Sequence, residues 1–235
     1  METVWSKADI HIHTTYSDGM AGVREVLEQA ANTDLQVVAI TDHNTIAGAL
    51  EARELTRQQR YPFELILGAE ISTAIGHVLA LFIEQPIAAG MSVEATLAAI
   101  HAQGGLAIVA HPYGKLVHSI GRRILDNCRG PQPIWRFDAL ETFNASLWDS
   151  RDNDAAAAAA VSLGLPACGG SDAHSLPTIG LGYTLFPGRS AAELRAAIVA
   201  GRVQPGGRRW SWGNLRMVAG SFIKRDINRT LRRSA

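Results

Sequence analysis

The sequence of 235 residues has few cysteines, no excess of either charge and no long apolar run. Its two cysteines, Cys128 and Cys168, do not indicate a disulfide framework. Because 22 basic residues balance 22 acidic ones, no overall field favours a polyanionic partner. The first residues lack the apolar core of a signal peptide, and no apolar run is long enough to cross a bilayer. These absences predict a soluble, cytoplasmic protein without a membrane partner.

Hydrophobic residues make up 47% of the chain, which is enough for a full core. Strand-like and helix-like patterns alternate throughout, and we find no linker and no internal repeat. The length suits one α/β barrel, so we predict a single domain over residues 1–235. One region departs from the neutral charge. From about residue 202 to the end, nine basic residues accompany a single acid, Asp226.

Short apolar runs rich in β-branched residues predict strands, and an i, i+3, i+4, i+7 spacing predicts helices. Strands are expected at 9–13, 35–40, 63–67, 77–83, 106–110, 137–143, 166–170 and 183–186. Helices are expected at 23–30, after Thr45, at 92–104, through the alanine run 155–160 to about 164, and after the capping box of Ser190 and Glu193. The stretch 113–133 is less periodic and predicts a long loop with one short helix.

The stretch 9–19 carries the most informative motif. Ile10 and Ile12 alternate with His11 and His13, so on an extended strand both imidazoles lie on one face. Two histidines placed in this way at a strand end can chelate one metal ion. The alternative is an edge strand whose histidines are solvated or bonded to the backbone. Asp18, in a Ser-Asp-Gly turn seven residues after His11, favours the metal.

Further ligating side chains occur at the ends of other predicted strands. In barrels of parallel strands the functional residues lie at the carboxyl ends of the strands. Imidazoles and carboxylates suit zinc, iron and manganese, and nine such groups exceed the needs of one ion. The sequence therefore predicts a centre for more than one ion. Its candidate ligands are His11, His13, Asp18, His43, Glu70, His77, His111, Asp172 and His174.

These motifs resemble those of the PHP (polymerase and histidinol phosphatase) superfamily of metal-dependent phosphoesterases. Asp-Ile-His-Ile-His, Ile-Thr-Asp-His-Asn, Gly-Ala-Glu-Ile-Ser, Gly-His-Val-Leu-Ala-Leu, Ala-His-Pro and Gly-Ser-Asp-Ala-His occur between residues 9 and 174 in the family's order. The resemblance implies a distorted (β/α)7 TIM-like barrel with two or three divalent ions at the carboxyl ends of its strands. It also implies three ligand sets: His11, His13, Glu70 and Asp172; Glu70, His77 and His111; and Asp18, His43 and His174.

Other polar residues are candidates for binding substrate or supporting the ligands. Three basic side chains follow the predicted strand 106–110 and are candidate partners of a substrate phosphate, with a solvated surface charge as the alternative for each: Lys115, Arg122 and Arg123. Asn144 ends another predicted strand and is expected to line the pocket. Asp9 and Asp42 are candidates for orienting an imidazole, or are carboxylates bonded to the backbone or water.

Together these features predict a hydrolase that cleaves a phosphate ester of a small molecule or nucleotide with a metal-bridging hydroxide. Asp18, His174 or a metal-bound water is expected to protonate the leaving oxygen. One alternative is a 5′→3′ exonuclease on short RNA or DNA, with the basic C-terminal segment as the nucleic-acid contact. Another is a non-catalytic, metal-binding regulatory module, which the complete ligand set disfavours.

Overall fold

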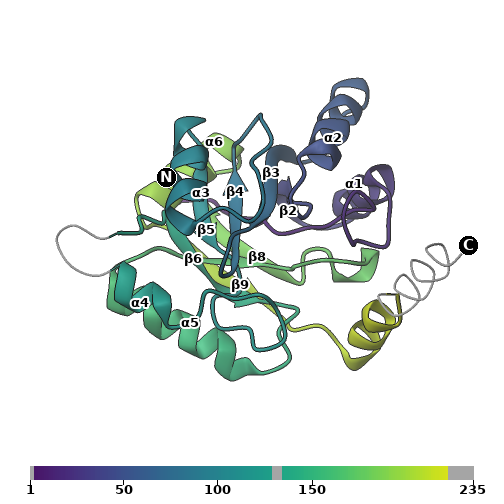
Figure 1. Ribbon diagram of the computed structural model, residues 1–235. Helices are drawn as coiled ribbons and strands as arrows, with labels where there is room; N and C mark the ends of the chain where they lie inside the picture. Colours follow the sequence, from purple (N-terminus) through teal and green to yellow (C-terminus); the bar gives the residue numbers. More distant parts are fainter. Residues whose placement is uncertain (1–2, 129–133, 222–235) are drawn as a thin grey trace, which may run out of the picture.

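The computed structural model describes residues 3–128 and 134–221, and there the strands form one mixed sheet that curves into a distorted barrel (Figure 1). The strand order is β7-β6-β5-β4-β3-β2-β1-β8-β9. The strands are β1 (Trp5–Asp9), β2 (Leu35–Ile40), β3 (Glu64–Ser72), β4 (His77–Leu81), β5 (Leu106–Val109), β6 (Ala139–Asn144), β7 (Ala167–Gly170), β8 (Gly182–Pro187) and β9 (Gln204–Gly207). The prediction of a distorted α/β barrel is confirmed.

The barrel closes where β7, at one end of the strand order, lies against β8 and β9 at the other. A side chain bridges this seam: the Gly169 N–H donates to Thr184 Oγ1 at 2.9 Å, and the same hydroxyl donates to the Gly169 carbonyl at 2.8 Å. Gly182 permits the close approach, because a Cβ there would collide with the carbonyl oxygen of Gly170. Closure therefore depends on small residues and one hydroxyl at this seam.

The helices lie around the outside of the strands (Figure 1). They are α1 (Val23–Ala31), α2 (Ala47–Gln58), α3 (Val93–Ala102), α4 (Arg123–Asn127), α5 (Ser150–Leu163) and α6 (Ala191–Val199), with a short 3-10 helix at Leu176–Thr178. The predicted capping box begins α6, since Ser190 Oγ accepts the Glu193 N–H at 3.2 Å. No helix in the described part of the chain has the length and apolarity needed to traverse a membrane.

Two apolar clusters explain why β2 is an uninterrupted apolar run. Val37 and Ala39 pack inside the barrel with Phe186, whereas Val38 and Ile40 pack outward with helix residues such as Val26. Successive residues of a strand point to opposite faces, so a strand covered on both faces must be apolar at nearly every position.

Three strands differ from the expectations. β1 ends at Asp9, and the two motif histidines follow it in an extended segment where Ile12 donates its N–H to Thr41 Oγ1 at 3.0 Å. β4 runs antiparallel to both of its neighbours, which puts His77 at the same end of the barrel as the carboxyl ends of β2 and β3. β9 was missed, because its Gln-Pro-Gly-Gly sequence has no strand propensity and it is held by pairing with β8.

Candidate metal centre

Glu70 lies at the centre of the candidate site. It belongs to β3, its side chain is 1% exposed, and both of its carboxylate oxygens contact imidazoles. Oε1 is 2.9 Å from His77 Nδ1 and 2.9 Å from His111 Nε2, and Oε2 is 3.1 Å from His43 Nδ1, 3.3 Å from His11 Nε2 and 3.3 Å from His13 Nε2. A carboxylate with imidazoles on both oxygens has the geometry needed to bridge two ions.

Asp172 approaches the same two imidazole nitrogens of the first motif as Glu70 does. Its Oδ1 is 3.5 Å from His11 Nε2 and 3.3 Å from His13 Nε2. The main chain brings these residues together, because the His13 N–H donates to the Ala173 carbonyl at 2.9 Å. The motif of His11 and His13 and the motif of Asp172 and His174, about 160 positions apart in the sequence, therefore lie side by side in the site.

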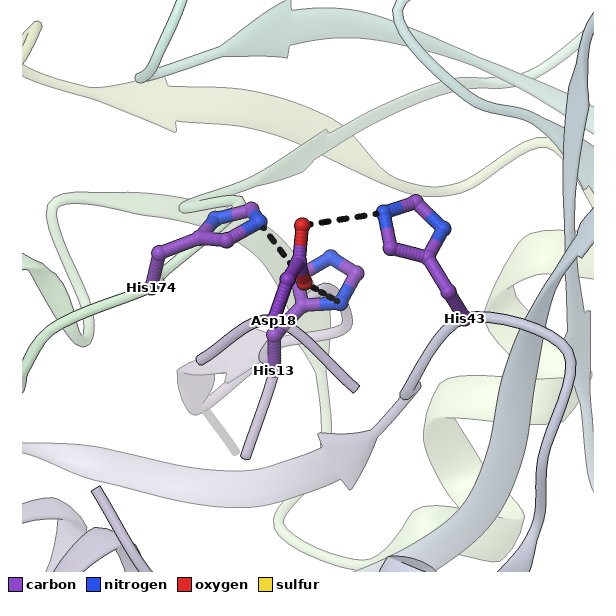
Figure 2. Close-up of side chains that lie close together, drawn as sticks. All are labelled: His13, Asp18, His43 and His174. Atoms are coloured by element: carbon purple, nitrogen blue, oxygen red, sulfur yellow. Dashed lines mark ion pairs between the residues drawn. The ribbon is translucent and has the colours of Figure 1, made fainter. Parts of the chain in front are cut away.

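A second cluster surrounds Asp18, which points into a group of three imidazoles (Figure 2). Asp18 Oδ1 is 3.2 Å from His174 Nε2 and 3.6 Å from His13 Nδ1, and its Oδ2 is 3.6 Å from His43 Nε2. His13 and His43 each present their other ring nitrogen to Glu70, so the two clusters share these rings.

Three imidazole nitrogens indicate that the site fits metal ions. His11 Nε2, His13 Nε2 and His77 Nδ1 are buried and have no hydrogen-bond partner among the described residues, although each lies beside a carboxylate oxygen. Buried polar atoms in native proteins are almost always satisfied, and a neutral imidazole nitrogen beside carboxylates is a preferred ligand for transition metals. Several such buried groups lie within ligating distance of one another, which is consistent with a polynuclear centre.

The same proximity shifts the acid–base properties of the site. Burial would raise the pKa of Glu70, but the neighbouring imidazoles, above all that of His11, lower its pKa well below the usual range. Burial would lower the pKa of His174, but the hydrogen bond that its ring donates to Asp18 and the charge of Asp172 raise this pKa to about 9. In the metal-free protein the carboxylates therefore favour the protonated forms of His11, His111 and His174, and a cation that binds these imidazoles displaces their protons.

Glu141, which the sequence analysis missed, supports the ligands from behind. It lies in β6 and is fully buried, and its Oε1 is 2.9 Å from His11 Nδ1. Its Oε2 accepts the backbone N–H of His111 at 2.8 Å and the side-chain amide of Asn144 at 2.9 Å. A carboxylate that accepts from Nδ1–H leaves Nε2 free to bind a metal. The available signal was a charged residue inside an apolar predicted strand.

Two candidate ligands lie on strained backbone. His111 has φ 29° and Asp172 has φ 51°, in the left-handed region that side-chain-bearing residues rarely adopt. Such conformations cost on the order of 1–3 kcal/mol each and persist where surrounding contacts fix them. The backbone of His111 is held by Glu141, which accepts the His111 N–H. The side chain of Asp172 is held by Ser146 Oγ and the Asn144 amide, which donate to its Oδ2 at 2.8 and 3.2 Å.

Asp9 and Asp42 contact the backbone and hydroxyl groups instead of orienting an imidazole. Asp9 accepts three backbone N–H groups, including that of Gly180 at 2.8 Å, and burial raises its pKa to about 6. Asp42 accepts the Thr14 N–H and hydroxyl at 2.7 Å each and the Ser17 hydroxyl at 2.6 Å. These bonds fix the turn that carries Asp18.

The four predicted substrate contacts occupy different places. Lys115 lines the pocket, but its Nζ lies 2.9 Å from Asp149 Oδ2 and 3.3 Å from Asp152 Oδ1. Arg122 and Arg123 are exposed at the start of α4, and the described residues that line the pocket include neither. Asn144 is fully buried behind Asp172, where it orients that carboxylate and lies away from the pocket lining.

A pocket of about 580 Å³ opens above the clustered ligands. Part of its wall comes from the C-terminal segment, through Trp210, Leu215 and Val218. Trp210 is anchored there because its N–H donates to the Ala145 carbonyl at 2.8 Å and its Nε1 donates to the Ser171 carbonyl at 3.0 Å. The described part of the basic segment therefore packs on the barrel, and residues 222–235 lie outside the described residues.

Comparison with protein families identifies the fold and the motifs together. The family model of the PHP domain matches residues 9–149, and a PHP-associated model matches residues 150–203. This chain belongs to the PHP family. The sequence resemblance is thereby confirmed, and the chain stands among the metal-dependent phosphoesterases of that family.

Among proteins similar in sequence, one aligns with most of this chain. An uncharacterized protein of Methanocaldococcus jannaschii is 38% identical over 161 residues, or 64% of this chain and 88% of that protein. The phosphoribosyl 1,2-cyclic phosphate 1,2-diphosphodiesterase of Eggerthella lenta is 42% identical over 64 residues, or 27% of this chain and 24% of the enzyme. A 5′-3′ exoribonuclease of Haemophilus influenzae is 42% identical over 67 residues, or 28% of this chain and 24% of that enzyme. The matched segment thus spans about a quarter of each of these two enzymes.

A solved structure shares the PHP fold over most of the chain. A two-domain protein from Bacteroides vulgatus, described as containing a predicted PHP-like metal-dependent phosphoesterase, aligns with a TM-score of 0.66 at 18% sequence identity. The alignment covers 88% of this chain and 66% of that one. At this identity the likeness shows the fold alone.

Proposed function

We propose that this protein hydrolyses a phosphate ester of a small molecule or nucleotide with two or three divalent transition-metal ions, namely zinc, manganese or iron. The observation that carries the proposal is the position of Glu70, which contacts five imidazoles on the floor of a pocket large enough for a small organic substrate. The name of the Eggerthella lenta relative supports phosphate-ester chemistry for the shared segment.

The proposed ligands fall into three sets, and the first two share Glu70. His11, His13, Glu70 and Asp172 would hold one ion; Glu70, His77 and His111 a second; and Asp18, His43 and His174 a third. Within each set the carboxylate–imidazole distances run from 2.9 to 3.6 Å, and because His43 also approaches Glu70 at 3.1 Å, the sets adjoin one another. When bound, such ions lower the pKa of water from ~15.7 to ~7 and neutralise charge on the phosphate oxygens.

The protein's own contribution is to orient these groups before substrate arrives. Glu141 keeps the proton of His11 on Nδ1, away from the site. Ser146 and Asn144 hold Asp172 in place through its Oδ2 and leave Oδ1 facing the imidazoles. Preorganised groups of this kind need no rearrangement during the reaction.

His174 can serve either as a ligand or as the acid that protonates the leaving oxygen, but not as both through the same nitrogen. Its Nε2 faces Asp18 Oδ1 at 3.2 Å, and its raised pKa of about 9 keeps a proton there in the metal-free site. With two ions bound elsewhere, His174 would remain a proton donor and Asp18 its partner. With three ions bound, that proton is displaced.

The test is a phosphatase screen on metal-depleted protein, with zinc, manganese and ferrous iron added back one at a time. We expect release of inorganic phosphate from at least one ester and two or three ions per chain by elemental analysis. Bound ions without turnover on any phosphomonoester, phosphodiester or oligonucleotide would contradict the proposal and favour a regulatory module.

A 5′→3′ exonuclease is the second candidate, favoured by the basic C-terminal segment and by the name of the Haemophilus influenzae relative. Four basic residues of the segment lie within the described part of the chain: Arg202, Arg208, Arg209 and Arg216. Release of mononucleotides from the 5′ end of a short labelled RNA would support this candidate.

A further inference from the structure

The pocket above the metal centre has a wall whose chemistry differs from that of its floor. The floor consists of imidazoles and carboxylates. The wall comes from three separate segments, namely the loop after β5, the loop after β6 and the C-terminal segment, and most of its side chains are apolar. Its main members are Leu116, Leu147, Trp148, Trp210, Leu215 and Val218.

Part of this apolar surface faces solvent, which is unusual for residues beside a polar centre. Leu116 is 90% exposed and Trp148 is 48% exposed, and Trp148 contacts Trp212 with ring centroids 3.7 Å apart. Contiguous exposed apolar residues at the rim of a pocket mark surfaces that bind apolar groups. A hydrogen bond holds these segments together: Arg209 Nη1 donates to the Trp148 carbonyl at 2.9 Å and links the C-terminal segment to the loop after β6.

The aromatic wall reaches the catalytic floor. Trp210 is 8% exposed, and its ring stands edge-on to that of His174 at a centroid distance of 6.1 Å. A group that binds against Trp210 therefore lies directly beside the place proposed for the phosphate.

The wall offers no free cation for a second phosphate. Among the described residues that line the pocket, Lys115 is the one basic side chain besides the histidines, and Asp149 and Asp152 both pair with it. Proteins that track a nucleic-acid strand combine aromatic platforms with a positively charged groove. The described wall has the aromatic side chains without that groove.

From this chemistry we infer the substrate class: a phosphate ester of an alcohol that carries one bulky apolar or aromatic group, which binds against Trp148, Trp210 and Leu215. The inference rests on the proposed phosphoesterase function and adds the identity of the organic part. The metal centre binds the phosphate, and the wall selects the group attached to it.

Two esters with primary-alcohol leaving groups test the inference: 3-phenylpropyl phosphate and 3-hydroxypropyl phosphate. Because their leaving groups are similar in acidity, the ratio of their kcat/KM values reports binding of the ring. We expect the phenylpropyl ester to be preferred roughly tenfold or more, as burial of the ring removes apolar surface from water. Trp148→Ala should lower this ratio roughly threefold or more.

The matched control is Trp5→Ala, since Trp5 is 46% exposed, lies on β1 and does not line this pocket. It should leave both kcat/KM values unchanged. A second variant, Leu116→Asp, changes a side chain that is 90% exposed, so folding should be kept. It should weaken binding of 3-phenylpropylphosphonate, measured by calorimetry on the metal-loaded protein.

The outcomes separate the inference from the function it rests on. Hydrolysis of neither ester by protein that hydrolyses another ester of the phosphatase screen would overturn the inference and leave the function standing, whereas hydrolysis of no ester in the screen with any metal would count against the phosphoesterase function. Equal hydrolysis of both esters, with no effect of Trp148→Ala on their ratio, would overturn the apolar wall as a specificity site and leave the function standing. If Trp148→Ala instead lowers the association state and leaves the ratio unchanged, the wall binds a second copy of the chain and the inference is wrong.

Discussion

Replacing Glu141 by glutamine should impair metal binding although Glu141 is not itself a proposed ligand. The carboxylate accepts from three donors: His11 Nδ1 on one oxygen, and the His111 N–H and the Asn144 amide on the other. Glutamine has one acceptor oxygen and one NH2 donor. The oxygen should stay with the two donors, so the NH2 group would face His11 Nδ1. That nitrogen must then accept, which moves the imidazole proton to Nε2 and blocks its lone pair.

The expected magnitude follows from this change of tautomer. Loss of a partner that orients a metal-bound imidazole typically lowers metal affinity 10–100-fold, or about 1.4–2.7 kcal/mol. The free energy of unfolding of the metal-free protein should fall by about 1–3 kcal/mol, because a buried charge-assisted hydrogen bond is replaced by a weaker neutral one. Since Ala139 and Leu140 of β6 keep their places in the apolar clusters, the variant should still fold.

Competition with a calibrated chelator measures the affinity, and nitrogen-15 NMR of the histidine rings reports the tautomer of His11. Asp138→Asn is the matched control. Asp138 also pairs with an imidazole, His101 Nε2 at 2.9 Å, and accepts the Ala107 N–H at 2.7 Å, but at the opposite end of β5 from the site. Unchanged affinity in Glu141→Gln with the proton of His11 shown on Nε2 would refute the reasoning, since the blocked lone pair would then be irrelevant.

Three further predictions concern the centre and the C-terminal segment. Glu70→Gln should lose at least one ion and lower turnover by orders of magnitude while circular dichroism is kept; full metal content with normal turnover would show that Glu70 is not a ligand. Metal binding should release protons at pH 7, and affinity should weaken as the pH falls below about 9, because Asp18 and Asp172 raise the pKa of His174 to about 9 and a ligand must be deprotonated. Calorimetry in two buffers of different ionisation enthalpy checks this, and binding without proton release would contradict it. Ending the chain at Ser221 removes five basic residues and spares the described pocket wall, so kcat on a small ester should not change; a flatter salt dependence of oligonucleotide binding would instead favour the exonuclease.

The candidate ligands were predictable because each belongs to a local pattern. The alternation of His11 and His13 with isoleucines, and the i, i+2 spacing of Asp172 and His174, are properties of neighbouring residues. Strand β2 was predicted to the residue, since both of its faces are covered and every position is constrained. Patterns of this kind can be recognised from the sequence alone, because they depend on neighbouring residues.

What could not be predicted depends on contacts between distant segments. Glu141 supports His11 across about 130 positions, and although a charge within an apolar strand marks Glu141 as unusual, the sequence does not identify His11 as its partner. The C-terminal segment was singled out for its basic charge alone, and its sequence does not show that Trp210 packs between the loops after β6 and β7. β9 forms although its residues disfavour strands, because the edge of β8 supplies its hydrogen bonds.

The direction of β4 is a long-range feature that makes the centre possible, but unlike the contacts above it has a signal in the sequence. His77 begins this strand, so in a barrel with β4 parallel to its neighbours its side chain would lie at the end away from the other ligands. Four steps along His77–Leu81 at ~3.3 Å each correspond to ~13 Å, far beyond the reach of an ion. The antiparallel pairing instead sets Ser72 opposite His77 and Glu70 opposite Leu79, and it puts His77 on the same face as Glu70, with Nδ1 2.9 Å from Oε1. A ligand at the start of an apolar run, among others that follow such runs, therefore indicates a reversed strand, and the order of residues along the chain is enough to reveal it.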